Sequence, residues 1–356
     1  MNHQENKKIP VAILGATGSV GQRFVEMLTN HPWFEITALA ASERSVGKPY
    51  REAVNWLMPS ALSPAIGDMI VSPCLPDLPC SLVFSGLDAS VAGEIETSFA
   101  EAGYMVLSNA RNHRMSHDVP LLVPEVNGDH LSLIHSQKFS KGRIITNPNC
   151  STIGLVMALK PLLDAFGLEA VNVVTMQAIS GAGYPGVASL DIMDNVIPFI
   201  KNEEHKIETE THKILGALQN GQIKHHDFKI SAQCNRVPVS DGHLECVSVT
   251  LKNKAKPSEI IEAWRKYTSD AQTMQLPTAP KHPIYYFEED TFPQPKRHRQ
   301  LDKGMALSVG RLRECAIFDY KFAILSHNTI RGAAGCALLN AELLVNHGYL
   351  KCPVSK

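Results

Sequence analysis

The 356-residue sequence lacks several features that would assign it to a specialised class of protein. It has no apolar run long enough to span a bilayer, and residues 1–10 are polar, unlike a signal peptide. Its net charge of −1 creates no global field that favours nucleic acid or anionic lipid. We therefore expect a cytoplasmic protein with no membrane partner and no nucleic-acid partner.

The sequence also lacks the cysteine spacing of a disulfide scaffold or a zinc module. Its eight cysteines form no C-x-x-C pair, and no histidines are interleaved with them at zinc-finger spacing. Among the fifteen histidines, His225 and His226 are adjacent, and His205 and His212 are too far apart for neighbouring helical turns. We predict free thiols in a reducing compartment and no metal site.

The composition of the chain fits a compact protein with two domains. Its length allows two hydrophobic cores, and 44% hydrophobic and 19% charged residues argue against disorder. Up to about residue 149, apolar strands alternate with amphipathic helices. Farther along, we predict long strands at 171–178, 244–251 and 305–312, separated by polar segments. Residues 328–345, rich in Gly, Ala and Leu, predict a final close-packed helix.

A glycine-rich turn follows the first predicted strand. The strand is Val11-Ala12-Ile13-Leu14, the turn is Gly15-Ala16-Thr17-Gly18-Ser19-Val20-Gly21, and a helix is predicted next. In this pattern Gly15 permits the tight turn, Gly18 lets the backbone approach a diphosphate, and Gly21 lets the helix pack against the strand. A purely structural turn is the alternative, but the strand–turn–helix context favours dinucleotide binding.

The end of the second predicted strand, 36–41, bears on the choice of cofactor. A 2′-phosphate needs arginine and hydroxyl donors, whereas an NAD site usually has a carboxylate there. The residues that favour NADP are Ser42, Arg44, Ser45 and Lys48. Glu43 is the one residue that could instead accept the ribose of NAD. Two further strands end in small polar residues, among them Ser85, and are expected to line the same crevice.

Asn147-Pro148-Asn149-Cys150 places a cysteine between an apolar strand and the start of a helix. Unpaired N–H groups and the helix dipole favour thiolate over thiol at such a position, and the thiolate is the nucleophilic form. The helix is predicted to continue from Cys150 until Pro161 and Gly167 close it. A buried structural cysteine is the alternative interpretation.

A second candidate segment runs from Arg236 to His243. A histidine beside a nucleophilic cysteine can take the thiol proton and later exchange protons with the substrate oxygen. An arginine offers a planar fork that suits a carboxylate. Taken alone, His243 could equally be an ordinary polar residue, and Arg236 could be solvated.

Together these motifs make the chain resemble the aspartate-semialdehyde dehydrogenase family, nearly from end to end. The resemblance is carried jointly by Gly15-x-x-Gly18-x-x-Gly21, Asn147-Pro148-Asn149-Cys150 and the segment from Arg236 to His243. Ser180-Gly181-Ala182-Gly183-Tyr184-Pro185-Gly186 is most similar to the branch common in archaea and fungi.

The resemblance implies roles for individual residues. Cys150 would be the nucleophile, His243 the acid/base, and Gln177 would orient the substrate carbonyl. Arg236 would bind the substrate carboxylate and Glu203 the amino group, with Lys206, Arg114 and Asn149 lining a phosphate pocket. The residues that would meet NADP are Gly15, Thr17, Gly18, Ser19, Val20, Gly21, Ser42, Arg44, Ser45, Ser85, Ser180, Gly181, Gly183 and Asn328.

The implied fold is α/β, with an N-terminal Rossmann-type dinucleotide-binding domain. The second domain would be an α+β catalytic and dimerisation domain resembling that of glyceraldehyde-3-phosphate dehydrogenase. We expect residues 1–149 and 328–356 in the NADP-binding domain and 150–327 in the catalytic domain. A homo-oligomer, either dimer or tetramer, is expected.

The implied reaction is reversible: L-4-aspartyl phosphate and NADPH give L-aspartate 4-semialdehyde, NADP and phosphate through a cysteine thioester. It belongs to the biosynthesis of lysine and diaminopimelate, threonine, methionine and isoleucine. A related acyl reductase, such as a malonyl-CoA or N-acetylglutamyl-phosphate reductase, would keep Cys150 and His243 but change the substrate contacts. A non-enzymatic NADP sensor would have no need for Cys150, His243 and Arg236 together.

Overall fold

The computed structural model describes residues 8–350, which form two compact units. Unit 1 comprises the residues up to Pro120, Leu131–Asn147 and those from Ala337 onward, and unit 2 comprises Leu121–His130 and Pro148–Cys336. The predicted domains differ from these units because Leu121–His130, residues 148–149 and residues 328–336 lie in unit 2. No helix within residues 8–350 is long and apolar enough to cross a membrane.

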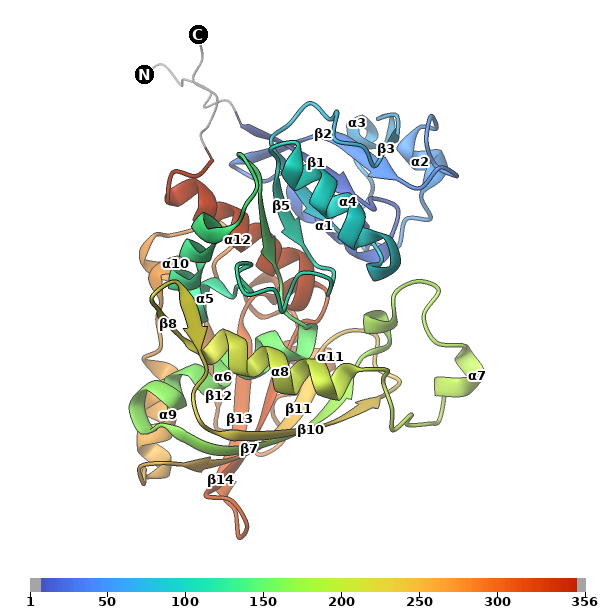
Figure 1. Cartoon of the computed structure of the whole chain (residues 1–356). Coiled ribbons are helices and arrows are strands. Elements are labelled where there is room, and N and C mark those ends of the chain that lie inside the picture. The colour runs from blue at the N-terminus through green and yellow to red at the C-terminus, as the bar shows by residue number, and fades with distance from the viewer. Residues whose placement is uncertain (1–7, 351–356) are drawn as a thin grey trace, which may run out of the picture. The chain divides into compact units, whose positions relative to one another are not determined.

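Unit 1 is built on a six-stranded sheet with the strand order β3-β2-β1-β4-β5-β6 (Figure 1). Every strand pair in it is parallel. This order is the one found in dinucleotide-binding folds, where ligands bind outside the carboxyl ends of the strands. The strands are β1 Ile9–Leu14, β2 Phe34–Ala41, β3 Ser72–Pro73, β4 Leu82–Ser85, β5 Met105–Ser108 and β6 Arg143–Thr146. The helices between them are α1 Ser19–Leu28, α2 Tyr50–Ala53, α3 Pro64–Gly67 and α4 Ala89–Glu101.

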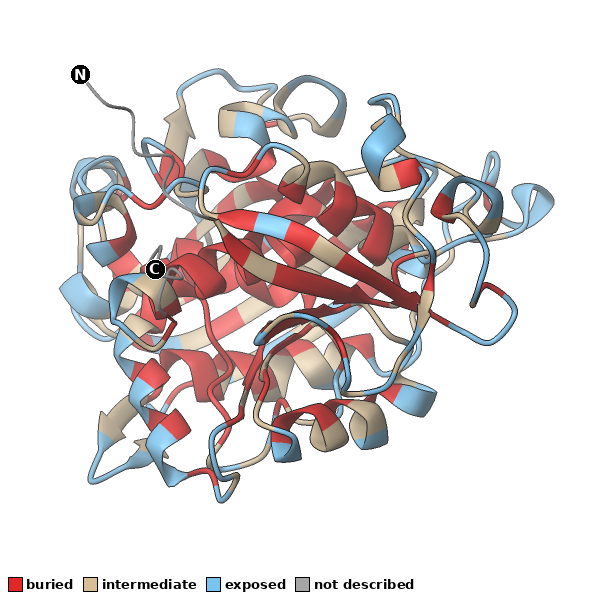
Figure 2. Cartoon of the chain, turned by 90° about the horizontal axis from the view of Figure 1, so that it is seen from above, coloured by how far each residue is buried: buried red, intermediate tan, exposed pale blue. Residues whose placement is uncertain are grey.

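The central strand β1 is apolar because both faces of a parallel sheet are covered. Val11, Ile13 and Leu14 are fully buried, as are Phe24 and Val25 on the inner side of α1. Figure 2 shows buried residues concentrated in strands and the helices packed on them, with exposed residues mainly in the outer loops and outer helix faces. The sequence pattern therefore predicted this part of the fold well.

The last helix, α12 Gly335–Asn346, contributes most of its length to unit 1. Its Asn340 amide donates to Asn147 Oδ1 at 2.7 Å. Its Glu342 carboxylate lies 2.8 Å from His31 Nε2, and both side chains are buried. The His31 ring stacks on Phe34, with ring centroids 4.7 Å apart. The helix α12 is thus hydrogen-bonded to Asn147 after β6 and to His31 between α1 and β2.

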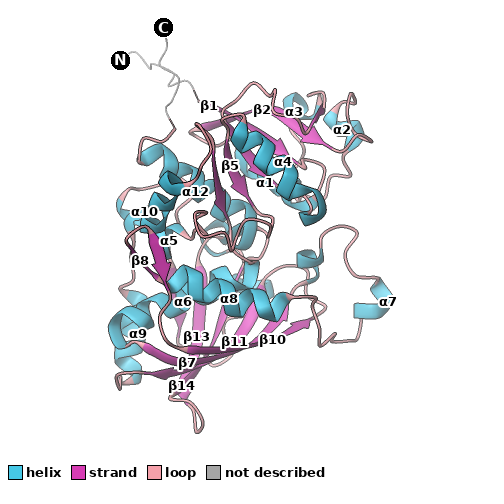
Figure 3. Ribbon diagram, viewed as in Figure 1, coloured by secondary structure: helices cyan, strands magenta, loops and turns pink. Residues whose placement is uncertain are grey.

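Unit 2 is built on a mixed six-stranded sheet with the order β10-β7-β11-β14-β13-β12, plus the hairpin β8-β9 (Figure 3). The strands are β7 Leu168–Gln177, β8 Ala217–Gln219, β9 Gln222–Lys224, β10 Lys229–Arg236, β11 His243–Leu251, β12 Ile284–Phe287, β13 Leu307–Glu314 and β14 Tyr320–Ser326. The helices are α5 Pro124–Asn127, α6 Cys150–Phe166, α7 Ser189–Ile192, α8 Glu203–Leu215, α9 Pro257–Arg265, α10 Asp270–Thr273 and α11 Pro295–His298. Shorter helical turns are Gly128–Ser136, Ile179–Ala182, Leu301–Gly304 and the π-helical turn Ile330–Ala334.

The helix α6 is the centre of the core of unit 2. Leu155, Val156, Met157 and Leu159 are fully buried in a cluster that includes residues from the sheet. The prediction that Pro161 helps to end this helix is wrong: Pro161 lies inside α6, and Gly167 ends it with a φ of 71°. Proline removes one backbone hydrogen bond, but burial of the apolar helix outweighs that loss.

Candidate active site

Cys150 is the first residue of α6, where the end of β6 leads into the helix. Asn149 caps this helix, since its Oδ1 accepts from the backbone N–H groups of Ser151 at 3.0 Å and Thr152 at 3.2 Å. Cys150 is partly exposed. The predicted placement of a reachable cysteine at a helix N-terminus therefore matches the structure.

His243, the first residue of β11, lies beside this cysteine. Its Nε2 is 3.2 Å from Cys150 Sγ, and its Nδ1 accepts a hydrogen bond from the backbone N–H of Ala178 at 3.0 Å. A ring nitrogen that accepts from an N–H carries no proton, so the ring proton of the neutral histidine is on Nε2. The Nε2–H group therefore points at the sulfur as a donor.

The environment of His243 keeps the ring neutral. Burial lowers the pKa of His243 to about 3, and the positive charge of Arg236 acts in the same direction, against the opposing effect of Glu203. A protonated ring would also turn an Nδ1–H toward the Ala178 N–H, and two donors repel. Both observations favour the neutral Nε2–H form throughout the physiological pH range.

Arg236, the last residue of β10, lies next to the same pair. Its Nη1 donates to the carbonyl oxygen of Ala178 at 2.7 Å. A Cβ atom on Gly181 would lie 2.9 Å from Arg236 Nη1 and 3.2 Å from His243 Cε1, so only a glycine fits there without a shift. Gln177, which pairs with Arg236 in the sheet register, is buried and donates to Thr175 Oγ1 at 3.3 Å.

Glu203 and Lys206 lie one turn apart on α8 and form an ion pair with each other. Glu203 Oε1 also accepts from Asn149 Nδ2 at 2.6 Å. Burial acts to raise the pKa of Glu203, but the charge and hydrogen bond of Lys206, with the bond from Asn149, outweigh it and lower the pKa. Two residues predicted for different substrate groups therefore neutralise each other here.

Two of the residues predicted to meet the cofactor, Ser180 and Asn328, are hydrogen-bonded to each other in unit 2. Asn328 Nδ2 donates to Ser180 Oγ at 2.8 Å, and Asn328 Oδ1 accepts from the backbone N–H of Gly242 at 2.8 Å. Gly183 follows with a φ of 73°. Asn328 thus connects the turn before His243 with the segment Ile179–Ala182.

In unit 1, the glycine-rich turn has the shape that a diphosphate requires. Gly15 has a φ of 72°, and a Cβ atom on Gly21 would lie 2.1 Å from the Gly15 carbonyl oxygen. The helix α1 begins after Gly18 with no side-chain cap and no acidic residue in its first turn. Its first N–H groups can therefore bind an anion, as helix N-termini do in dinucleotide sites. Thr17, Ser19 and Val20 belong to this turn, so the residues present fit the diphosphate of NADP.

The end of β2 has the donors that a 2′-phosphate needs. Ser42 and Arg44 are exposed, Ser45 is buried, and the Ser45 N–H donates to the Ser42 carbonyl in a turn. Because β2 is parallel to and beside β1, this turn lies at the same sheet edge as the glycine-rich turn. Ser85, at the end of β4, is fully buried, and Arg114 is buried with its Nη2 donating to the Asn109 carbonyl at 2.8 Å.

Several residues around Cys150 were not predicted from the sequence. The Glu210 carboxylate accepts from the backbone N–H of Asn149, and Ala178 contacts both His243 and Arg236. Gly332 lies against Cys150, since a Cβ atom there would be 2.7 Å from Cys150 Cβ. Ala178 and Gly332 act through backbone atoms, which no side-chain pattern reveals. Glu210 lies seven residues after Glu203, two helical turns along the same face, and that spacing could have indicated it.

Glu245 is a further buried acid close to the start of α6. It is 1% exposed, and neither carboxylate oxygen has a hydrogen-bond partner within residues 8–350. Burial raises the pKa of Glu245 well above its ordinary value, although the nearby Ser151 hydroxyl opposes this and Glu203 adds to it. Burial therefore favours the neutral acid over the carboxylate at this position.

Replacing Glu245 with glutamine is expected to flatten part of the pH dependence of stability. The folded state binds this proton more tightly than the unfolded chain, so wild-type stability falls as pH rises from about 4.3 toward the folded pKa. The slope from this group is about 1.4 kcal/mol per pH unit in that window. The thermal midpoint of Glu245→Gln, measured from pH 5 to 8, should rise relative to wild type as the pH increases.

The exposed Glu169 provides the control, because Glu169→Gln changes the same group in solvent. Its midpoint should follow wild type at every pH. A constant difference between Glu245→Gln and wild type across the range would mean that Glu245 is ionised in the folded protein.

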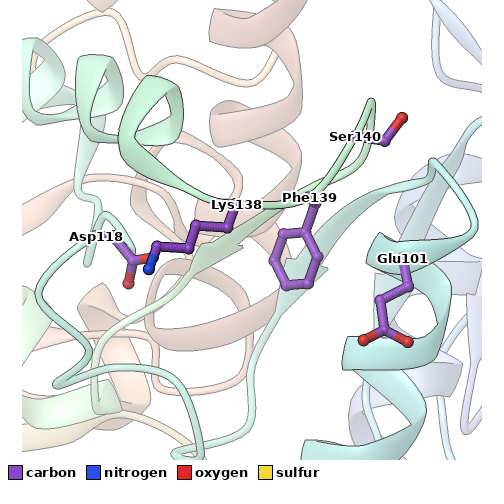
Figure 4. A pocket seen from close by; sticks show the side chains of 5 residues that line it. All are labelled: Glu101, Asp118, Lys138, Phe139 and Ser140. Atoms are coloured by element: carbon purple, nitrogen blue, oxygen red, sulfur yellow. The ribbon is translucent and has the colours of Figure 1, made fainter.

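Thiols, metal-ligating side chains and a surface hollow complete the description of the chain. Seven cysteines form no disulfide within residues 8–350, and Cys352 lies outside the described residues. Within residues 8–350, no group of three or more His, Cys, Asp or Glu side chains is placed to hold a metal ion. A hollow of about 350 Å³ in unit 1 is lined by Glu101, Asp118, Lys138, Phe139 and Ser140, none of which was predicted as a site residue (Figure 4).

Comparison with known proteins gives consistent results for both units. Residues 10–134 match the family model described as the semialdehyde dehydrogenase NAD binding domain, and residues 159–331 match its dimerisation domain. The chain is 51% identical over 353 residues to the aspartate-semialdehyde dehydrogenase of Schizosaccharomyces pombe, covering 96% of this chain and 99% of that protein. It is 49% identical over 339 residues to that of Archaeoglobus fulgidus, covering 94% and 97%.

Solved structures agree. The crystal structure of aspartate semialdehyde dehydrogenase with NADP from Candida albicans matches with a TM-score of 0.90 and 44% identity, covering 96% of this chain and 100% of that chain. The predicted α/β fold, with a parallel-sheet cofactor domain and a dimerisation domain, is confirmed. A shared fold at this identity over nearly the full length leaves one conclusion: the chain belongs to the aspartate-semialdehyde dehydrogenase family.

Proposed function

We propose that this chain uses Cys150 to convert L-4-aspartyl phosphate reversibly to L-aspartate 4-semialdehyde through a covalent thioester. The chain is an NADP-dependent oxidoreductase of its family, and the comparisons support this function rather than the acyl reductase alternatives. The observation that carries the residue-level proposal is the 3.2 Å contact between Cys150 Sγ and His243 Nε2 at the start of α6.

In the proposed first step, the Cys150 thiolate attacks the acyl carbon of the acyl phosphate. The carbon–oxygen bond to phosphate breaks, phosphate leaves, and a thioester remains on the sulfur. NADPH, when bound, supplies the hydride that reduces the thioester to the aldehyde. The position at a helix N-terminus suits Cys150, because it favours the sulfur as a thiolate both when it attacks and when it leaves.

His243 was predicted to exchange protons, and its contacts favour a more limited role. With Nδ1 occupied by the Ala178 N–H, the neutral ring has one proton to present, on Nε2. This group can donate a hydrogen bond to the thiolate and to the oxygen on which negative charge develops. Proton exchange at His243 would first require the ring to release Ala178.

Arg236, Gln177, Glu203 and Lys206 are proposed to bind the substrate from β10, β7 and α8. Arg236 Nη1 donates to the carbonyl oxygen of Ala178, and the guanidinium has further N–H donors that can bind a carboxylate. Gln177 is proposed to orient the substrate carbonyl. The Glu203–Lys206 ion pair would open toward an amino group and a phosphate, with Asn149 beside it. Arg114 is proposed as a further phosphate ligand.

For the cofactor, we propose that the turn Gly15–Gly21 holds the diphosphate of NADP. Ser42, Arg44 and Ser45 would hold its 2′-phosphate, since they present hydroxyl and guanidinium donors at the end of β2. Ser85 is proposed to contact the same molecule. From the family resemblance we propose four further NADP contacts in unit 2: Ser180, Gly181, Gly183 and Asn328.

We propose further that the chain works in the cytoplasm as a homo-oligomer. The segment 184–199 of unit 2 exposes large apolar side chains that a partner would cover; they are Tyr184, Leu190, Met193, Val196 and Phe199. This segment lies within the residues that match the dimerisation domain. Light scattering of the purified protein would distinguish a monomer from a dimer or a tetramer.

The direct test of the proposed activity is an assay of the reverse reaction. Purified protein is mixed with aspartate semialdehyde, NADP and inorganic phosphate, and absorbance of NADPH is followed. We expect NADPH formation that depends on phosphate. Malonyl-CoA with NADPH serves as the second arm: reduction of the CoA ester, with no reaction of the semialdehyde, would favour the acyl reductase alternative.

Arg236→Lys is expected to weaken substrate binding although it keeps the positive charge. A lysine ammonium cannot bind a carboxylate with two parallel hydrogen bonds and cannot reach it as a planar fork. The variant should lower kcat/KM for aspartate semialdehyde by more than about tenfold, equivalent to about 1.4 kcal/mol. The same substitution at Arg265, which is exposed and paired with Glu288, is the control and should have no such effect.

The phosphate ligands should show a different pattern. Lys206→Ala and Arg114→Ala are expected to raise KM for phosphate more than KM for aspartate semialdehyde. If these two substitutions and Arg236→Lys all changed the KM for phosphate and the KM for aspartate semialdehyde equally, the three residues would hold the framework of the site. They would then not bind separate groups of the substrates.

A further inference from the structure

The residue that precedes the nucleophile is held by two carboxylates of α8. Glu203 Oε1 accepts from the Asn149 side chain at 2.6 Å, and Glu210 Oε2 accepts from the Asn149 backbone N–H at 2.6 Å. All three residues are at most 5% exposed. Because Asn149 in turn caps α6, the two glutamates fix the place where that helix, and Cys150, begins.

The same helix also binds the edge strand β10. Glu204 Oε1 accepts from the Cys234 N–H at 3.1 Å, and Glu208 Oε1 accepts from the Ala232 N–H at 3.0 Å. β10 ends at Arg236, so one helix bonds both the strand of the arginine and the cap of the nucleophile. The four carboxylates thus form two pairs. Glu204 and Glu208 accept hydrogen bonds from β10, and Glu203 and Glu210 accept hydrogen bonds from Asn149.

Of the four, Glu210 has the most direct connection to the position of Cys150. Its acceptor bond fixes the peptide N–H of Asn149, one residue before the reactive sulfur, across a sequence separation of 61 residues. That N–H is buried, so losing its acceptor costs about 1–3 kcal/mol unless the turn moves. A shift of this turn would change the distance from Cys150 Sγ to His243 Nε2.

We propose that Glu210 is a positioning residue: it acts through Asn149 to hold Cys150 at the start of α6 in reach of His243. Glu210 touches no reacting atom in this scheme. The inference rests on the proposed function only in taking Cys150 as the nucleophile, and alkylation of Cys150 tests it without any substrate.

The test compares three variants of Glu210 with a matched control on the same helix. Glu210→Gln keeps an acceptor of the same length, Glu210→Asp keeps the charge but is shorter, and Glu210→Leu removes the acceptor. The control is Glu208→Leu, which removes an acceptor from β10 instead of from Asn149. The rate of Cys150 alkylation by iodoacetamide, located by peptide mapping, is measured over pH 6–9, together with kcat and KM.

We expect Glu210→Gln to stay within about threefold of wild type, because the hydrogen bond is kept. Glu210→Asp and Glu210→Leu should lower both the alkylation rate and kcat by about tenfold or more, with KM for aspartate semialdehyde changed much less. Glu208→Leu should leave the alkylation rate unchanged. If Glu210→Leu does not fold, Glu210→Asp against Glu210→Gln gives the same comparison.

Two results would overturn the proposal. In the first, Glu210→Asp has the alkylation rate and kcat of wild type, whereas Glu210→Gln is defective in both. That result would mean that the charge of residue 210 matters and the length of its side chain does not. The other is an equal loss of alkylation in Glu208→Leu, which would give Glu210 only a general part in the stability of α8. A different outcome would count against the proposed function alone. In it, the wild-type protein does not turn over aspartate semialdehyde, but the variants show the alkylation pattern expected above.

Discussion

Cys150→Ser is expected to lower turnover of aspartate semialdehyde by at least about 10³-fold while leaving the fold and NADP binding intact. A serine hydroxyl is far less acidic than a thiol, so the start of α6 cannot make it an anion at neutral pH. The substitution changes one atom in a partly exposed position, and the cap by Asn149 does not involve that atom. Steady-state kinetics measures the loss of turnover. Fluorescence then tests whether NADP binding is retained, and circular dichroism tests whether the fold is retained.

Cys315→Ser is a useful control because the pKa of the Cys315 thiol is also lowered by its surroundings. Backbone N–H groups of Phe318 and Ile317 lower the pKa of Cys315, whereas burial raises the pKa of Cys234 and Cys336 to about 12. Iodoacetamide should therefore label Cys150 and Cys315 first. An acyl-phosphate analogue should protect only Cys150, and full activity after complete labelling of Cys150 would exclude it as the nucleophile.

His243→Leu is expected to lower kcat by about 10²–10³-fold, the usual cost of removing one donor to a developing oxyanion. The pH profile distinguishes this role from proton exchange. Because the pKa of His243 is lowered to about 3, the ring is neutral above that pH and should contribute no limb between pH 5.5 and 9. We therefore expect wild type and variant to have profiles of the same shape but different height.

His243→Asn completes this test, since its amide can donate a hydrogen bond but cannot carry a proton. It should retain more activity than His243→Leu if donation is what matters. His226→Asn, at an exposed position of unit 2, is the control for a lost imidazole. A limb near neutral pH that is present in wild type and absent in both His243 variants would show that His243 exchanges protons after all.

Sequence could predict those parts of the site that depend on local chain geometry. The turn from Gly15 to Gly21 and the helix start at Cys150 are fixed by a few consecutive residues, and both were located correctly. Pro161 was misread because its cost is local, whereas the burial that offsets it comes from the whole core of unit 2.

Other features could not be read from the sequence because they depend on long-range contacts. The Ala178 N–H that sets the protonated nitrogen of His243 comes from a residue with no polar side chain, 65 positions away. The hydrogen bond from the Asn149 side chain to Glu203 likewise joins residues 54 positions apart. Pairing of this kind is decided by packing, which no single segment encodes.

The attachment of α12 to unit 1 has a consequence for the order in which the protein can fold during synthesis. Chains are made from the N-terminus, and an N-terminal domain usually folds first. Here the contact between His31 and Glu342 joins residues 311 positions apart, and the hydrogen bond between Asn147 and Asn340 joins residues 193 positions apart. All six strands of the parallel sheet leave the ribosome early, but the contacts that α12 supplies can form only after the whole of unit 2 has been translated. A nascent chain stalled before residue 337 lacks both contacts and should be a substrate for chaperones, whereas one released after α12 should not.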